Sequence, residues 1–292
     1  KDQFRNTAVL MTLVLQSPGP IVFTWGPFSL RWYGLLIGLA MVLGLLLARH
    51  LAARRGLPPN SMSDLLLWLV VGSLPLARFY YVAFEWERYR DGPWWKVLAL
   101  WQGGMAIHGA LLGGSAALYL FARRQRLNFW LLADCIVPSL SLGQSIGRWG
   151  NFFNNEAYGE VLPPDSSLWI QLQLPDGSRV HPTFLYESLW NLGLFGILLF
   201  LSYRRQPPPG SLLGLYLLGY SLGRFWIEGL RTDSLMLGPL RVAQGVSLLL
   251  IGAGLAVMLT AQRRASAHLS PVRPSPALST GIPAPEHPPK EP

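Results

Sequence analysis

Seven long apolar runs constrain this chain more than any other feature of its sequence. A run of about 18 or more apolar residues can cross a hydrocarbon core of about 30 Å as a helix. Four runs contain no Asp, Glu, Lys or Arg, and three carry one ionisable residue each: Arg78, Asp134 or Glu187. They cover residues 32–48, 65–84, 97–122, 127–147, 183–203, 206–223 and 242–262. We therefore expect an all-α integral membrane protein with seven transmembrane helices.

The distribution of charge indicates how these helices cross the membrane. The formal net charge is +9, but the basic residues gather at alternate junctions, represented by Arg54, Arg123, Arg204 and Arg263. The other connections mix basic with acidic residues. Basic loops stay in the cytoplasm, so we expect the N-terminus outside and the C-terminus in the cytoplasm. The basicity is then a topology signal with membrane lipid as its partner, and we expect no nucleic acid partner.

One membrane domain, residues 25–262, accounts for most of the chain. Residues 1–24 are expected to form an N-terminal interfacial segment, and residues 263–292 a disordered Pro-rich cytoplasmic tail with too few apolar residues to fold. The long connection 148–182 has turn signals around the alternating run WIQLQL. It predicts a small outer (periplasmic) cap with a short strand pair between helices 4 and 5.

A single cysteine, Cys135, limits the chemistry that the chain can carry. It excludes an intramolecular disulfide framework and a CxxC metal site. Because Cys135 lies in an apolar run, we interpret it as a small core residue. We expect neither a metal ion nor a cofactor.

The stretch GRWGNFFNNEAYG, residues 147–159, is unusually polar for the end of a membrane helix. One arginine could place its charge in the interface, and one polar residue could cap the helix. This explanation does not account for five polar residues together, which are Arg148, Asn151, Asn154, Asn155 and Glu156. A planar guanidinium suits bidentate contact with phosphate oxygens, so we expect a phosphate-bearing headgroup here.

A second polar cluster, GRFWIEGLRTDS, ends the sixth run on the same side. Arg224 and Glu228 are four residues apart and can pair on one helix face, with Arg231 close behind. A purely structural salt bridge is an alternative. If the cluster faces residues 147–159, however, Arg148 and Arg224 converge to form an anion site.

Other candidate positions carry weaker signals. His108, in GGMAIHG, is expected inside the third span, either as a general base or as a neutral histidine hydrogen-bonded between helices. Glu187 and Tyr186 follow His181 at the start of the fifth span. Tyr33, in RWYG, is typical of an interfacial aromatic anchor.

Taken together, these motifs resemble those of the bacterial prolipoprotein diacylglyceryl transferases. The family's element G-R-x-G-N-F-x-N-x-E-x-x-G matches residues 147–159 at every fixed position, Gly159 included. RWYG, GGMAIHG, HPTFLYE and GYSLGRFWIEGLR follow the same order, over about residues 25–262. One departure is Ala77 before Arg78, where the family usually has a glycine pair.

The resemblance implies transfer of an sn-1,2-diacylglyceryl group from phosphatidylglycerol to the lipobox cysteine of a prolipoprotein signal peptide, with glycerol 1-phosphate as leaving group. It implies that Arg148 and Arg224 hold the phosphate and that Glu228 positions Arg224. His108 is the expected base, although arginine-assisted or water-mediated deprotonation stays open. The substrate-binding set then comprises Tyr33, Asn151, Asn154, Glu156, Gly159, Tyr186, Glu187, Glu228 and Arg231.

The expected location is the bacterial plasma (inner) membrane, in a multi-pass topology with the active site toward the outer face. The main alternative is a membrane transporter or a non-catalytic binder of an anionic lipid or solute, which would use the same arginines. Transporters often contain inverted repeats with broken helices. We find no such internal symmetry, so the sequence favours the transferase.

Overall fold

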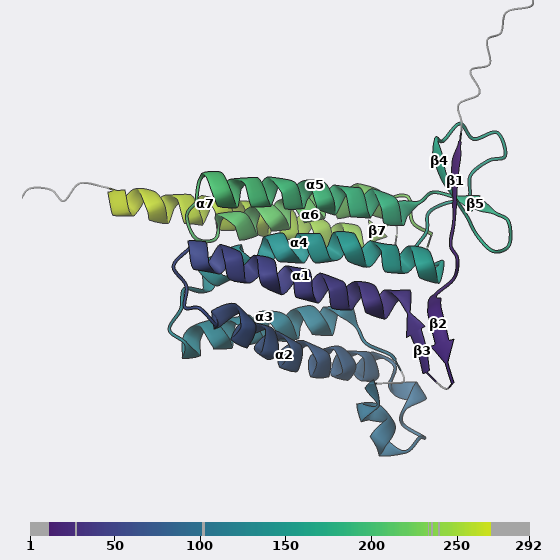
Figure 1. Cartoon of the computed structure of the whole chain (residues 1–292), viewed down its shortest axis with the longest axis horizontal. Helices are drawn as coiled ribbons and strands as arrows, with labels where there is room; N and C mark the ends of the chain where they lie inside the picture. The colour runs from purple at the N-terminus through teal and green to yellow at the C-terminus, as the bar shows by residue number, and fades with distance from the viewer. Residues whose placement is uncertain are drawn as a thin grey trace, which may run out of the picture.

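The fold is built from helices that lie roughly parallel or antiparallel to one another, with the strands gathered at one end (Figure 1). We obtained a computed structural model that describes residues 12–26, 28–100, 103–232, 234, 236–238 and 240–269. The described residues form seven α-helices. These are α1 Trp32–Arg54, α2 Ser61–Phe84, α3 Ile107–Arg124, α4 Phe129–Asn154, α5 Thr183–Arg204, α6 Ser211–Glu228 and α7 Val242–Leu269.

Five of these helices are long and apolar enough to cross a membrane: α1, α2, α4, α5 and α7. Mostly helical structure and a membrane protein are therefore confirmed. The two 18-residue helices, α3 and α6, do not belong to this set, so seven transmembrane helices remain a prediction.

The predicted third span begins too early. Two 3₁₀ helices, Trp86–Arg88 and Trp94–Leu98, follow α2, and α3 starts only at Ile107. Gly103 and Gly104 both have a φ of +77°, in the left-handed region that breaks a helix. His108 therefore lies in the first turn of α3 rather than in the middle of a membrane span.

Other predicted boundaries also shift. Helix α4 continues to Asn154, so the polar stretch that follows Gly147 is largely helical and the predicted cap begins later than residue 148. Helix α7 continues to Leu269, seven residues into the predicted tail. The rest of the tail, residues 270–292, lies outside the described residues.

Short strands modify the predicted all-α architecture. β4 (Ile170–Gln173) pairs antiparallel with β5 (Arg179–Val180), which confirms the predicted strand pair of the cap. β1 (Leu13–Gln16) adds to β4 in parallel. β2 (Ile21–Trp25) and β3 (Phe28–Arg31) form a hairpin before α1, and β6 (Met236–Leu237) pairs with β7 (Leu240–Arg241) before α7. The predicted interfacial segment 1–24 thus contributes β1 to the cap sheet, while residues 1–11 lie outside the described part.

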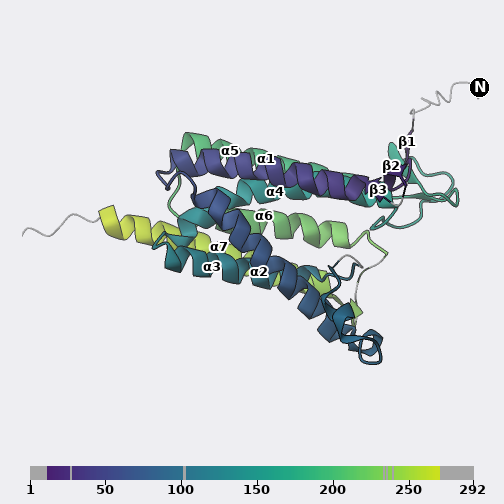
Figure 2. The ribbon, with the colours of Figure 1, turned by 60° about the horizontal axis from the view of Figure 1, so that its bottom comes forward.

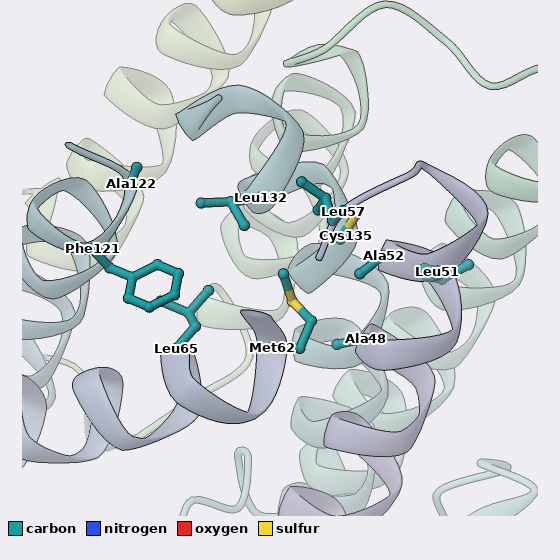
Figure 3. Close-up of a cluster of buried hydrophobic side chains, with 10 residues drawn as sticks. All are labelled: Ala48, Leu51, Ala52, Leu57, Met62, Leu65, Phe121, Ala122, Leu132 and Cys135. Carbon is teal, nitrogen blue, oxygen red and sulfur yellow. The ribbon is translucent and has the colours of Figure 1, made fainter. Parts of the chain in front are cut away.

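The helices pack in antiparallel neighbours: α2 against α3, α1 against α4, α4 against α5, and α6 against α7. Figure 2 shows α2 and α3 as a pair beside the other helices. At the end away from the strands, buried side chains of the first four helices and their loops form a core (Figure 3). Hereafter, "strand end" means the end of the bundle at which β1–β5 lie.

The cap is fixed to the strand end by its own apolar core. Phe152 from α4 and Phe184 from α5 pack against Leu172, Leu174 and Val180 of the cap sheet. Below this contact, Ser145 and Ser188 exchange hydrogen bonds between α4 and α5, with Ser145 Oγ donating to Ser188 O at 2.9 Å and Ser188 Oγ to Ser145 O at 2.9 Å. The ends of α4 and α5 are therefore held together directly beneath the cap.

Candidate active site

A single buried carboxylate, Glu187, is the centre of the site. It lies in the second turn of α5, and its side chain is only 4% exposed. Arg148 of α4 approaches Glu187 Oε2 at 2.6 Å, and Arg224 of α6 approaches Oε1 at 2.9 Å. Arg231 reaches the same Oε1 at 3.2 Å. The expected convergence of Arg148 and Arg224 is thus confirmed, with Glu187 between them.

Helix α6 contributes a second carboxylate to this group. Arg224 Nη2 lies 2.6 Å from Glu228 Oε2, which confirms the predicted pairing one helical turn apart. Beyond the end of α6, Arg241 donates hydrogen bonds to the backbone oxygens of Glu228 and Arg231. Arg241 therefore ties the turn after α6 to the start of α7. We call Arg148, Arg224, Arg231, Glu187 and Glu228 the arginine–carboxylate cluster.

The C-terminal turn of α4 carries polar residues of the stretch 147–159. Asn151 accepts a hydrogen bond from Arg148 at 3.4 Å and donates to Glu156 at 2.9 Å, and Asn154 also donates to Glu156, at 3.2 Å. Asn155 has a φ of +52°, the left-handed conformation that ends many helices. This turn brings Glu156 back over α4 and links it to Arg148 through Asn151.

The remaining predicted binding residues lie around the same end. The Tyr33 ring lies against Gly150 of α4, so close that a Cβ on Gly150 would be 2.3 Å from the ring. Gly159 forms an isolated β-bridge with Arg231 and so joins the start of the cap to the segment after α6. The Tyr186 hydroxyl lies 3.4 Å from His181 Nδ1, and the Tyr186 ring stacks on Trp226. The structure thus gathers these residues at the strand end.

His108 is the exception among the predicted site residues. Its imidazole is exposed at the start of α3 and lies beside the Tyr80 ring, with 5.8 Å between the ring centroids. Within the described part of the chain, no hydrogen bond or ion pair joins His108 to the arginine–carboxylate cluster. The interhelical hydrogen bond that the sequence left open is likewise absent from the described contacts.

A second buried arginine, Arg78, holds the segment that leads to His108. Arg78 is 4% exposed and donates to the backbone oxygens of Lys96 at 2.6 Å, Val97 at 2.8 Å and Gly104 at 2.9 Å, and also to Gly103 O. Its guanidinium lies 5.2 Å from the centre of the Tyr89 ring. We call this arrangement the Arg78 clamp.

The arginine–carboxylate cluster is suited to binding an anion. Three guanidinium groups face two carboxylates, so these five groups carry one net positive charge. Arg148 and Arg224 retain 22% and 20% exposure of their side chains. Guanidinium groups that are partly exposed and held in place by carboxylates can bind phosphate oxygens without first being ordered.

Sequence reasoning missed two residues here. Arg241 was unassigned, although a basic residue on the predicted outer side runs against the positive-inside pattern and was a usable signal. Asn191, buried on α5 one turn beyond Glu187, was also unassigned. A polar residue within an apolar run was the available signal for Asn191, although the same signal also marks structural residues.

Comparison with known proteins identifies close relatives. Residues 20–260 match the family described as prolipoprotein diacylglyceryl transferase. A phosphatidylglycerol–prolipoprotein diacylglyceryl transferase of Synechococcus elongatus is 54% identical over 84% of this chain and 88% of that protein. The proteins of the same name from Gloeobacter violaceus and Synechocystis are 51% and 53% identical, over 87% and 82% of this chain and 97% and 88% of those proteins.

Proposed function

This chain belongs to the prolipoprotein diacylglyceryl transferase family, and we propose that it transfers the sn-1,2-diacylglyceryl group of phosphatidylglycerol to a lipobox cysteine. A C–S bond forms between the thiol and the glyceryl carbon, while the C–O bond to phosphate breaks. Glycerol 1-phosphate leaves, and the thiol proton passes to a base. The arginine–carboxylate cluster is the observation in the structure that carries this proposal.

Arg148 and Arg224 bind the phosphodiester, with Arg231 beside them. The single negative charge of the phosphodiester balances the single positive charge of the cluster. When the C–O bond breaks, the leaving phosphate gains negative charge, and preorganised guanidinium groups stabilise that change. Glu187 and Glu228 position the arginines, because Glu187 contacts Arg148 at 2.6 Å and Glu228 contacts Arg224 at 2.6 Å.

The residues around the end of α4 orient the headgroup. Asn151, Asn154 and Glu156 form a hydrogen-bonded set next to Arg148, and amide groups can both donate to and accept from the headgroup hydroxyls. The rings of Tyr33 and Tyr186 lie at the same strand end of the bundle. Gly159 maintains the β-bridge that carries the cap over Arg231.

His108 is our proposed proton acceptor. Histidine is the usual general base near neutral pH, and the exposed imidazole at the start of α3 can meet a substrate that enters from the lipid. Catalytic contacts are often completed only in the substrate complex. The lack of a described hydrogen bond or ion pair between His108 and the arginine–carboxylate cluster is therefore compatible with this role.

We place the protein in the bacterial plasma membrane with the strand end outside. All seven helices span the membrane in this arrangement, and the basic junctions at the opposite end lie in the cytoplasm. Phosphatidylglycerol then enters sideways from the bilayer, and the acceptor cysteine arrives on its membrane-held signal peptide.

A transfer assay with purified protein tests the function. The protein is supplied with phosphatidylglycerol and a lipobox peptide, and the peptide is analysed by mass spectrometry. We expect a mass gain of one diacylglyceryl group. A transporter or a non-catalytic lipid binder leaves the peptide mass unchanged, and an unchanged mass with well-folded protein contradicts the proposal.

A further inference from the structure

A small cavity lies between α5 and α6, next to the arginine–carboxylate cluster. Its empty volume is about 170 Å³, including space that is open to solvent, and it is bordered by Glu187, Trp190, Asn191, Tyr220, Gly223, Arg224 and Ile227. Typical ligand pockets are larger, at about 300 Å³ or more. Asn191 follows Glu187 by four residues, and Tyr220 precedes Arg224 by four, on antiparallel helices. The cavity therefore extends about one helical turn, or about 6 Å, from the cluster toward the middle of the bundle.

Asn191 presents an unused hydrogen-bond acceptor at this cavity. The residue is 2% exposed, and its Oδ1 has no hydrogen-bond partner among the described residues. The backbone of Asn191 is fixed from the other side, because Ser141 Oγ donates to Asn191 O at 2.9 Å. A buried acceptor without a donor is costly and calls for an explanation. A ligand that brings a donor into the cavity supplies one.

Trp190, the neighbour of Asn191 on α5, forms a fixed aromatic part of the cavity wall. Trp190 Nε1 donates to Gly219 O at 2.8 Å, which fixes the indole across α6. The indole lies so close to Gly223 that a Cβ there would be 2.2 Å from the ring. Only glycine therefore fits at residue 223. The cavity accepts a small group and has little room to adapt to a large one.

The chemistry of the two substrates identifies the donor. The diacylglyceryl group has ester oxygens but no hydrogen-bond donor. The hydroxyls of phosphatidylglycerol lie on the terminal glycerol, across the phosphate from the acyl chains and toward water. The acceptor peptide brings a thiol, and this thiol must reach the glyceryl carbon from the side opposite the leaving oxygen.

We propose that this cavity receives the cysteine side chain of the acceptor peptide, and that Asn191 Oδ1 accepts a hydrogen bond from its S–H group. With the phosphate on Arg148 and Arg224, the acyl chains extend toward the middle of the bilayer, so the reacting carbon lies on the cavity side of the arginines. The inference rests on the proposed function. It adds a residue that holds the acceptor thiol, whereas His108 is proposed only to take the proton of that thiol.

A double-mutant cycle tests this contact. Binding of the lipobox peptide and of its Cys→Ala analogue is measured without phosphatidylglycerol, on the wild-type protein and on Asn191→Leu in lipid nanodiscs. We expect the wild type to prefer the cysteine peptide by about fivefold, the effect of one hydrogen bond of about 1 kcal/mol. Asn191→Leu should lose this preference. Asn191→Ala provides the same measurement if the leucine variant folds poorly.

Two results would overturn the inference. One is an equal preference for the cysteine peptide in the wild type and the variant, or no preference in either. The other is a fall in phosphatidylglycerol affinity with an unchanged peptide cycle, which would assign the cavity to the lipid. Failure of the proposed function is distinguishable, because the wild type would then transfer no diacylglyceryl group in the mass assay.

Discussion

The Arg78 clamp and the arginine–carboxylate cluster both place arginine side chains between the helices, yet they differ in the partners of the guanidinium groups. Arg78 is almost completely buried and donates to backbone oxygens of the segment before α3. Arg148 and Arg224 are about one-fifth exposed and contact the side chains of Glu187 and Glu228.

This difference separates a structural role from a binding role. Backbone carbonyls cannot move away without unfolding the segment that carries them, so the contacts of Arg78 are fixed. Arg148 and Arg224 stay partly exposed while Glu187 and Glu228 hold them, so a phosphate can bind to the guanidinium groups without displacing the carboxylates. The presence of an arginine in an apolar helix is therefore a weaker guide to function than the kind of partner that its guanidinium contacts.

The largest expected effect is that of Arg148→Ala. The substitution removes one phosphate ligand and leaves Glu187 with one guanidinium fewer. We expect kcat/KM for diacylglyceryl transfer to fall by about 10³-fold, as for the loss of a preorganised charge at a transition state. The mass-spectrometric transfer assay measures it, and thermal unfolding should show a folded protein.

A matched control for this prediction is Arg88→Ala. Arg88 pairs with Glu85 on the exposed surface, and we expect its loss to leave transfer nearly unchanged. Substantial transfer by Arg148→Ala would mean that the phosphate is bound elsewhere. The arginine–carboxylate cluster would then have no binding role that distinguishes it from the Arg78 clamp.

The second-largest expected effect is that of His108→Gln, which tests whether a residue of α3 takes part in catalysis. We expect His108→Gln to lower kcat by about 10²-fold, the usual contribution of a general base, with an unchanged KM for phosphatidylglycerol. His50→Gln is the control, because His50 stacks on Tyr203 at the opposite end of the bundle. Near-normal turnover of a folded His108→Gln protein would assign His108 a structural role.

The smallest effect on catalysis is expected for Arg78→Met, which should instead change stability. Up to four backbone oxygens lose their donor, and we expect the free energy of unfolding to fall by about 3 kcal/mol. Activity per folded molecule should change by less than about threefold. Reversible unfolding followed by tryptophan fluorescence measures the stability, and Arg78→Lys should recover part of it. A stable but inactive Arg78→Met protein would place Arg78 among the catalytic groups.

Much of the fold and part of the site could be predicted from the sequence. Apolar run length located the helices, and the spacing of Arg224 and Glu228 predicted an ion pair that the structure contains. The predicted positions of the helix ends were less accurate, because helix ends depend on local contacts. Gly103 and Gly104 interrupt the start of the predicted third span through their left-handed backbone, and Arg78 donates hydrogen bonds to the backbone oxygens of both.

The central position of Glu187 and the cavity beside Asn191 could not be predicted from apolar run length or residue spacing. Both depend on how α4, α5 and α6 pack, and residues 148, 187 and 224 are far apart along the chain. The family resemblance indicated which residues matter, but it did not show that one carboxylate contacts three arginines. Only the packed structure relates Asn191 to the cluster.

A structure of the protein with bound phosphatidylglycerol tests the central claim most directly. We predict that the phosphate oxygens lie within about 3.2 Å of guanidinium nitrogens of Arg148 and Arg224, with the acyl chains directed toward the middle of the bundle. A phosphate bound away from both arginines, while their contacts with Glu187 stay intact, would contradict the account.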